Sequence, residues 1–237
     1  MSVILGFDTA TADTAVAVTS GWEPVSVALV GPGEDGRPAH GRALLGAIED
    51  AVGAAGGWAR INRVAVGLGP GSFTGLRIGV STARALAQAR GIPIMGVLTT
   101  SALAAGIAEL PESAGRPRLA VVDARRSEVF AALDAAGSGP SEPVVGAPAE
   151  IARSFPSGLV DGALAAGDGS VRFRSEIEAA GVEVLSDSNP AHRLSALQIC
   201  RLGAEMAPGS PGELKPHYLR RPDAERWLER DNGNRTS

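Results

Sequence analysis

The sequence contains little of what several common catalytic sites require. Its 237 residues include one cysteine, Cys200, one lysine, Lys215, and three widely separated histidines. One cysteine excludes a disulfide framework and a thiolate metal site, and the histidines do not form a zinc motif such as His-Glu-Xaa-Xaa-His. Without a lysine after a glycine-rich turn, a Walker A phosphate loop is also excluded. We expect no metal site.

Aromatic residues, long apolar runs and excess basic charge are scarce as well. Aromatics make up 4% of the chain, and the 44% of hydrophobic residues are mostly Ala, Val and Leu, enough for the core of one or two domains. No stretch reaches the ~20 apolar residues of a membrane span. Met1 to Asp8 has no basic n-region of a signal peptide. We therefore expect a cytoplasmic protein. Its net charge of −4 indicates that any RNA is held mostly by something else.

The most informative segment is residues 67–79, which read Gly-Leu-Gly-Pro-Gly-Ser-Phe-Thr-Gly-Leu-Arg-Ile-Gly. An apolar run from Arg63 to Leu68 leads into a glycine and proline turn. Ser72 is a candidate cap for a helix that extends to about Arg90. A strand, turn and helix of this kind can hold an anion at the helix N-terminus, or let another chain approach closely. The sequence alone leaves both interpretations open.

The order of apolar runs predicts two similar halves. Strand patterns at 3–7, 14–19, 25–30 and 63–68 and helical patterns at 39–56 and up to residue 90 give β-β-β-α-β-α. A second half repeats the plan less clearly, with strands at 119–122, 128–133, near 159 and at 182–185, and helices ending near 153, at 171–180 and at 191–206. We expect two α/β lobes with a cleft, at 1–98 and 99–222, and a charged, disordered tail at 223–237. Residues 207–222 contain four prolines and are predicted to wander over the surface.

Two polar clusters follow strands of this plan. Asp8 and Thr9 end the first strand, where a carboxylate and hydroxyls suit a phosphate and metal site or, equally, a simple Asx turn. Residues 123–130, Asp-Ala-Arg-Arg-Ser-Glu-Val-Phe, form either a charged hairpin tip or a loop facing the cleft opposite Asp8. Its arginines could contact phosphate, although bulky side chains also obstruct backbone amides. Ser72 does not sit in the nucleophile elbow Gly-Xaa-Ser-Xaa-Gly, so a serine hydrolase is poorly supported.

Several motifs together resemble the bacterial TsaB family over roughly residues 3–222. They are Asp8-Thr9-Ala10-Thr11, His40-Gly41-Arg42, the stretch from Gly69 to Gly79, Pro93-Ile94-Met95-Gly96-Val97, Asp123-Ala124-Arg125 with Glu128-Val129-Phe130, and Tyr218-Leu219-Arg220. The resemblance implies two lobes of the actin-like ATPase, ribonuclease H-like fold. It also implies a non-catalytic partner of TsaD, the enzyme that places threonylcarbamoyl on adenosine 37 of tRNAs reading codons that begin with A.

The resemblance further implies the partners. They are TsaD in a heterodimer, the ATPase TsaE, tRNA indirectly through the complex, and a second copy when the chain is alone. Gly96-Val97 is followed by Leu98-Thr99-Thr100, without the His-Xaa-Xaa-Xaa-His metal motif of the catalytic relative. No catalytic residue and no required cofactor are expected, and weak ATP or ADP binding is allowed. The alternatives are an active ATP-dependent small-molecule kinase of the same fold, with Asp8 as the metal-site carboxylate, and a protease, as the wider family was once labelled.

The resemblance also assigns two sets of residues. The partner interface is expected on the two helices of the first lobe, with residues His40, Leu44, Leu45, Ile48, Val52, Gly75, Leu76 and Gly79. A vestigial nucleotide cleft is expected at Asp8, Thr9, Gly71, Ser72, Asp123, Arg125, Gly167 and Gly169. Glycines and spare apolar side chains on the two helices would let a partner's helices pack into a four-helix interface.

Overall fold

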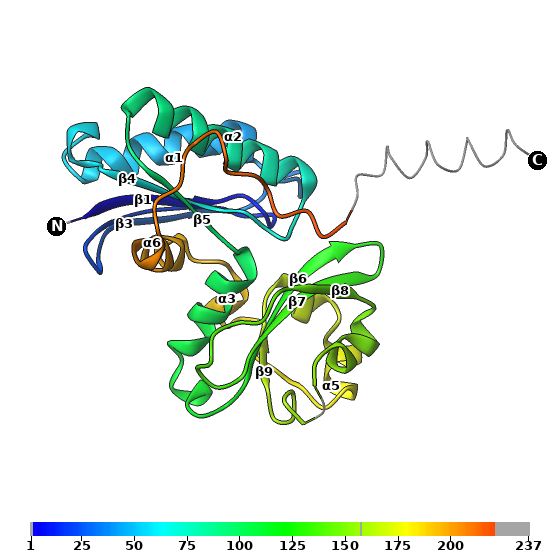
Figure 1. Ribbon diagram of the computed structural model, residues 1–237. Coiled ribbons are helices and arrows are strands. Elements are labelled where there is room, and N and C mark those ends of the chain that lie inside the picture. Colours follow the sequence, from blue (N-terminus) through cyan, green and yellow to red (C-terminus); the bar gives the residue numbers. More distant parts are fainter. Residues whose placement is uncertain (1, 157, 221–237) are drawn as a thin grey trace, which may run out of the picture.

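The computed structural model describes residues 2–156 and 158–220. Within them the chain forms two lobes, each built on a five-stranded sheet (Figure 1). The predicted tail at 223–237 lies outside the described residues.

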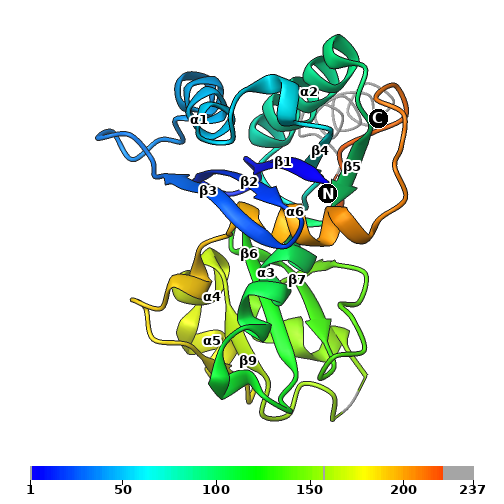
Figure 2. The ribbon, with the colours of Figure 1, turned by 90° about the vertical axis from the view of Figure 1, so that its left-hand side faces the viewer.

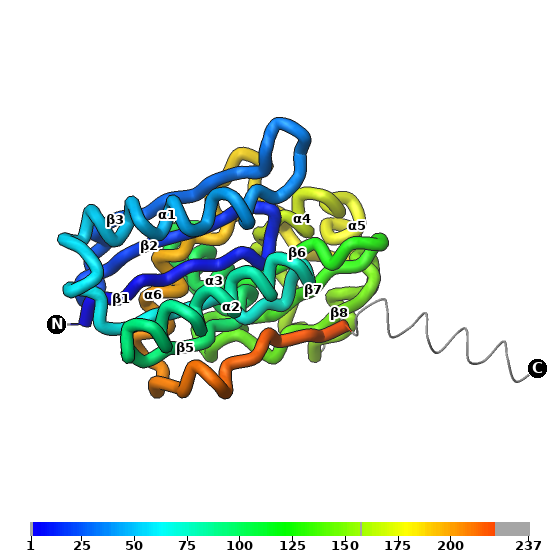
Figure 3. The backbone as a smooth tube through the Cα atoms, turned by 90° about the horizontal axis from the view of Figure 1, so that it is seen from above, coloured from blue at the N-terminus to red at the C-terminus, as the bar shows by residue number. Residues whose placement is uncertain are grey.

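The first sheet has the strand order β3-β2-β1-β4-β5. Its strands are β1 Val3–Asp8, β2 Thr14–Ser20, β3 Glu23–Val30, β4 Arg63–Gly67 and β5 Ile94–Val97. The first three strands pair antiparallel, and β4 and β5 continue in parallel. The helix α1 His40–Ala54 lies between β3 and β4 in the chain, and α2 Phe73–Arg90 joins β4 to β5; both cover one face of the sheet (Figure 3). The predicted β-β-β-α-β-α order is confirmed.

The second sheet repeats the same plan, with the order β8-β7-β6-β9-β10 and the same pattern of antiparallel and parallel pairs. Its strands are β6 Arg118–Arg125, β7 Glu128–Asp134, β8 Val144–Gly146, β9 Leu164–Ala166 and β10 Glu183–Val184. Its outer face carries α4 Asp168–Arg172, α5 Arg174–Ala179 and η3 Pro148–Ser154. The strand expected near residue 159 is a turn, and β9 begins five residues later, because Asp161 and Gly162 interrupt the apolar run. The 171–180 helix is two short helices.

The last helix of each half packs against the sheet of the other half. The helix α3 Thr99–Ala108 contacts β6, β7 and β9, whereas α6 Ala196–Glu205 contacts β1, β2 and β4. The two helices also contact each other and form a middle layer between the sheets (Figure 2). One apolar core passes through this layer and includes Ile4, Val122 and Ile199. The lobes are therefore joined by buried surface as well as by the chain. The expected lobe boundary at 98/99 stays a prediction.

The segment after α6, residues 207–220, is named here the C-terminal strap. It begins beside β5, where the Gly209 amide donates to the Ile94 carbonyl at 2.8 Å. It then runs along the first lobe to the hairpin of the second (Figure 1). The prediction that this proline-rich segment runs over the surface is confirmed, since none of its residues is buried. Leu214 and Leu219 are partly buried and pack against the apolar cores, which the sequence did not predict. The short helices η1 Trp58–Arg60, η2 Pro111–Ser113 and η4 Pro190–His192 complete the connections.

Candidate functional site

The glycine-rich turn is held by the loop that follows β1. The Ser72 amide donates to the Ala10 carbonyl at 2.7 Å, and the Ser72 hydroxyl caps α2 by accepting from the Gly75 amide at 3.1 Å. The predicted strand, turn and capped helix are thus confirmed. The amides of Phe73 and Thr74 precede the first helical bond, from the Leu76 amide to the Ser72 carbonyl.

Asp8 is an internal acid rather than a cleft-facing one. Its side chain is 1% exposed and accepts from the Ala10 amide at 2.6 Å and from the Thr99 hydroxyl at 2.7 Å. Burial raises the pKa of Asp8 to about 6, against the smaller opposing effect of these two hydrogen bonds. The Thr99 oxygen in turn accepts from the Gly69 amide at 3.1 Å. Asp8 therefore ties β1 to the start of α3, and the Asx-turn interpretation fits it best.

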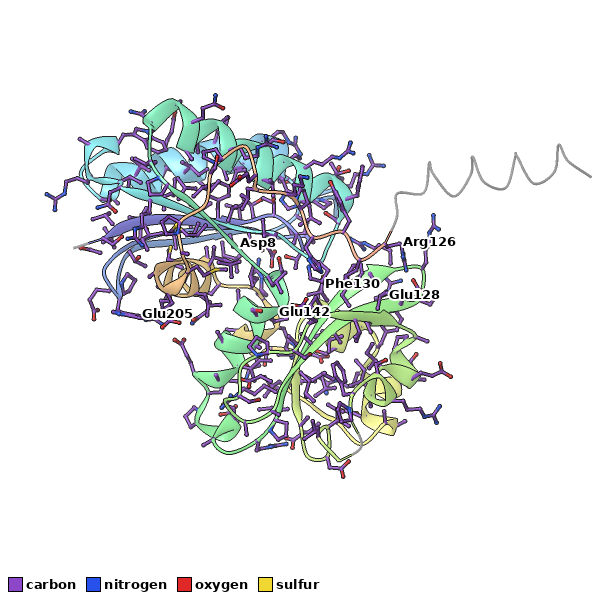
Figure 4. All side chains as sticks on the ribbon, in the orientation of Figure 1. Asp8, Arg126, Glu128, Phe130, Glu142 and Glu205 are labelled. Carbon is purple, nitrogen blue, oxygen red and sulfur yellow. The ribbon has the colours of Figure 1, made fainter. Side chains whose placement is uncertain are left out.

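The cleft between the lobes contains a cavity of about 420 Å³. Three segments line it: the start of α2, the β6–β7 hairpin and the end of the C-terminal strap. The lining residues are Gly71, Ser72, Phe73, Leu76, Asp123, Ala124, Arg125, Arg126, Phe130, His217, Tyr218, Leu219 and Arg220. Figure 4 shows Phe130 between the lobes and Arg126 near the end of the strap. The structure thus brings together Gly71, Ser72, Asp123 and Arg125 of the expected cleft.

The other four expected cleft residues do not line this cavity. Asp8 and Thr9 are buried, and the Thr9 hydroxyl donates to the Gly75 carbonyl at 2.7 Å. Gly167 and Gly169 lie against β6, where an added Cβ would collide with Val121 or come within 3.0 Å of the Asp123 amide. The close packing of α4 on β6 accounts for these two glycines without a nucleotide.

The hairpin tip that closes the cleft has an unusual backbone. Arg125, Arg126 and Ser127 have φ angles of 64°, 53° and 58°, a left-handed region that glycine adopts more readily than residues with a Cβ. Asp123 stabilises the tip, because its carboxylate accepts from the Arg125 amide at 2.9 Å and pairs with Arg172 at 2.8 Å. The tip therefore presents arginine side chains where a glycine-rich loop would present bare amides.

The strap supplies the residues that sequence reasoning missed. The His217 amide donates to the Leu68 carbonyl at 2.8 Å, and Arg220 donates to the Ala124 carbonyl at 3.1 Å and pairs with Glu128. Leu219, between them, packs against the interlobe core. The motif Tyr218-Leu219-Arg220 is part of the resemblance, but its contacts with both lobes depend on tertiary structure that no local sequence pattern shows.

The expected interface residues divide into buried and exposed ones. Leu44, Ile48, Val52 and Leu76 are at most 2% exposed and face the core, so the expectation that they offer spare apolar surface is corrected. Gly75 and Gly79 face Thr9, since an added Cβ at either would collide with that residue. Among the expected residues with side chains, Leu45 is the exposed one, at 60%.

His40 is also internal. Its Nδ1 accepts from the Thr14 hydroxyl at 2.8 Å, and its Nε2 donates to the Thr11 carbonyl at 3.1 Å. Burial lowers the pKa of His40, against the effects of the Thr11 carbonyl and the Asp13 charge. The residue thus fixes the start of α1 to the β1–β2 turn.

No described helix is long and apolar enough to cross a membrane. Over the same described residues, no group of three or more His, Cys, Asp or Glu side chains is arranged to hold a metal ion.

The doubled strand order, with exchanged final helices and a cleft between the lobes, defines an actin-like ATPase fold. YeaZ from Pseudomonas aeruginosa shares this fold at a TM-score of 0.74 and 23% identity, over 92% of this chain and 100% of that one. A family model described as TsaD, tRNA N6-adenosine threonylcarbamoyltransferase, matches residues 33–173, more than half of the chain. The chain belongs to this family.

Curated relatives show which members of this family the chain is similar to. An uncharacterized Mycobacterium tuberculosis protein is 34% identical over 70% of this chain and 67% of its own length. The Escherichia coli tRNA threonylcarbamoyladenosine biosynthesis protein TsaB is 37% identical over 54% of this chain and 52% of its own. The resemblance to TsaB is confirmed. The chain matches about half of the E. coli relative and 23% of a Mycobacterium leprae relative that is 41% identical.

Proposed function

We propose that this chain is a non-catalytic assembly subunit for tRNA threonylcarbamoyladenosine biosynthesis. It pairs with a TsaD-type enzyme through the outer face of α1 and supports threonylcarbamoyl transfer to adenosine 37 of tRNAs reading codons that begin with A. Membership of the TsaD family and the names of the relatives support this role. A TsaE-type ATPase, an indirect association with tRNA through the complex and a cytoplasmic location belong to the same proposal. It requires no cofactor and allows weak ATP or ADP binding.

The observation that carries the proposal is the glycine content of the outer face of α1. Gly46 and Gly53 are exposed, and an added Cβ at either would meet no atom within 4 Å. A glycine inside a helix costs roughly 0.5–1 kcal/mol relative to alanine. No contact among the described residues requires these two glycines, whereas a partner helix that packs closely against α1 would require them.

The apolar and charged side chains near these glycines also fit a helical partner. Leu45 lies beside Gly46 and is 60% exposed. The outer surface of α1 also carries the exposed carboxylates Glu49 and Asp50, which basic residues on a partner helix would complement. The proposed homodimer, related by a twofold axis, and the heterodimer with a paralogue both use this face.

The kinase alternative receives less support from the geometry. It needs Asp8 to face the phosphate and metal in the cleft. Instead the Asp8 carboxylate is buried and hydrogen-bonded to Ala10 and Thr99. The arginines of the hairpin tip, Arg125 and Arg126, line the cavity, and the tip lacks the glycines of a phosphate-binding loop.

Light scattering on a sizing column tests the pairing. The chain is measured alone and mixed with the TsaD-type protein of the same organism, and a new one-to-one species is expected. Leu45→Glu is expected to abolish that species without unfolding the chain. Leu159→Glu provides the matched control, since Leu159 is 41% exposed in the second lobe. Independent elution of the wild-type proteins at micromolar concentration, or unchanged pairing of Leu45→Glu, would count against the proposed interface.

A further inference from the structure

An exposed cluster of aromatic and arginine side chains lies at the mouth of the interlobe cleft. The rings of Phe73 and Tyr218 are 5.3 Å apart between centroids. The Arg77 guanidinium lies 3.9 Å from the Phe73 ring centroid, and its Nε donates to the Tyr218 hydroxyl at 3.4 Å. Phe73 is 36% exposed and Tyr218 is 41% exposed. Aromatics make up 4% of the chain, so two exposed rings in contact are notable.

Tyr218 is held in place although its ring is exposed. The residue before it is anchored to Leu68 by a backbone hydrogen bond. The residue after it, Leu219, packs in the interlobe core. A ring fixed at both neighbours loses little conformational freedom when a flat ligand stacks on it. The cluster is therefore a preorganised stacking platform.

The charge around the platform is positive, although the whole chain has a net charge of −4. Among the described residues, five arginines and three carboxylates surround it, and these residues are Arg77, Arg125, Arg126, Arg172, Arg220, Asp123, Glu128 and Asp168. Asp123 and Glu128 form ion pairs with arginines of this set. An excess of arginines beside exposed rings suits a ligand that combines phosphates with flat bases.

We propose that this surface, formed by Phe73, Arg77, Tyr218 and the hairpin arginines Arg125 and Arg126, binds a single-stranded segment of RNA. Bases stack on Tyr218 and Phe73, and the arginines contact the phosphates. The cavity beside the platform, about 420 Å³, receives an unstacked nucleotide. This inference rests on the proposed function, because that function supplies an RNA partner. The RNA surface at the cleft is nevertheless distinct from the outer face of α1, where the protein partner is proposed to bind. A local basic surface on an acidic chain gives weak binding that a larger complex would reinforce.

Fluorescence anisotropy with a labelled single-stranded RNA and with a tRNA transcript tests the proposal. The full-length chain is measured alone and mixed with the TsaD-type protein. Tyr218→Leu keeps apolar packing but removes the aromatic face, and Arg77→Gln removes one charge. Each is expected to weaken binding at least about fivefold, in line with the value of one stacked base. Arg77→Gln is also expected to reduce the slope of log affinity against log salt by about one. Arg84→Gln, an exposed arginine further along α2, is the matched control.

The outcomes separate this proposal from the pairing proposal. Weaker RNA binding by both variants, with Arg84→Gln unchanged and pairing on the sizing column intact, supports the RNA surface. The proposal is overturned if the wild-type chain binds no RNA, either alone or mixed with the TsaD-type protein. It is also overturned if the two variants bind RNA as tightly as the wild type does. An equal loss of RNA affinity in Arg84→Gln would show general charge attraction and overturn the proposal. Displacement of the RNA by ATP at a similar concentration would show a mononucleotide site and overturn it as well. Loss of pairing in Tyr218→Leu would indicate a protein contact instead.

Discussion

The Thr99 hydroxyl donates a 2.7 Å hydrogen bond to the carboxylate of Asp8, across 91 residues of sequence. Thr99 begins α3, the helix that crosses from the first half of the chain to the sheet of the second. Asp8, at the end of β1, therefore fixes the start of α3 at the junction between the lobes. This relationship explains why Asp8 is internal although an exposed carboxylate would suit metal chemistry.

Asp8→Asn is expected to stabilise the protein at neutral pH. The pKa of Asp8 is raised from 3.8 to about 6, so the folded state binds this proton more tightly than the unfolded state does. The protonated Asp8 carboxyl group therefore favours folding relative to the ionised one. This contribution to stability is fully present below pH 3.8 and is lost as pH rises through about 6. At pH 7 the ionised form costs up to about 3 kcal/mol, from 1.36 kcal/mol per pKa unit. Chemical denaturation at pH 7 and pH 4 measures the gain, which should disappear at pH 4. A less stable variant at pH 7 would contradict the assignment.

His40 is expected to make stability depend on pH in the opposite direction. Burial lowers the pKa of His40 below 6.5, so the unfolded state binds the proton more readily. Stability from this residue is present above pH 6.5 and is lost as pH falls toward the folded-state pKa. Thermal unfolding of the wild type and of His40→Gln between pH 7.5 and 5.5 measures the difference. The wild type should lose more stability than the variant over this range, and parallel curves would show that His40 does not titrate as described.

Ser127→Gly is expected to stabilise the β6–β7 hairpin. Ser127 has a φ angle of 58°, and a left-handed residue with a Cβ costs roughly 1–2 kcal/mol, part of which the greater freedom of glycine in the unfolded chain offsets. We expect a gain of up to about 1 kcal/mol in urea unfolding. Ser81→Gly, at an exposed position inside α2, should instead destabilise by about 0.5 kcal/mol. Changes of the same sign at both positions would argue against strain at the tip.

Arg220→Ala is expected to release the end of the C-terminal strap. The change removes the bond to the Ala124 carbonyl and the pair with Glu128, and should cost about 1–2 kcal/mol because a charged donor is lost. Hydrogen exchange should become faster at the His217 amide, which donates to Leu68. Arg153→Ala removes an exposed pair with Glu150 and should leave exchange in the strap unchanged. Unaltered exchange in Arg220→Ala would mean that the strap is held by its apolar contacts alone.

Much of the fold could be predicted from the sequence because its signals are local. The alternation of apolar strands with glycine turns predicted four of the five strands of the first sheet and both of its helices, but not β5. Ser72 was correctly identified as a cap. The helix α3 was not predicted from the sequence, and the exchange of α3 and α6 could not be, because the sequence of a helix does not show which sheet the helix covers. The surface course of the strap was predicted because its prolines indicate irregular backbone, but prolines do not show that Leu214 and Leu219 pack against the apolar cores.

The candidate site was predicted less completely for a related reason. A glycine in a helix indicates that another segment packs closely against it, but the sequence does not show whether that segment belongs to the same chain or to a partner. Gly75 and Gly79 accommodate Thr9 from inside, whereas Gly46 and Gly53 face open space. Helical periodicity likewise could not show that Val52 faces the core while Leu45 faces solvent.

The measurement that tests the central claim most directly is threonylcarbamoyl transfer to tRNA in a reconstituted system from one organism. The TsaD-type enzyme, the ATPase and the threonylcarbamoyl donor are held constant, and this chain is omitted, added as wild type, or added as Leu45→Glu. The account predicts strong modification only with the wild-type chain, and activity with Leu45→Glu close to that without the chain. Equal modification with and without the wild-type chain would contradict the assembly role.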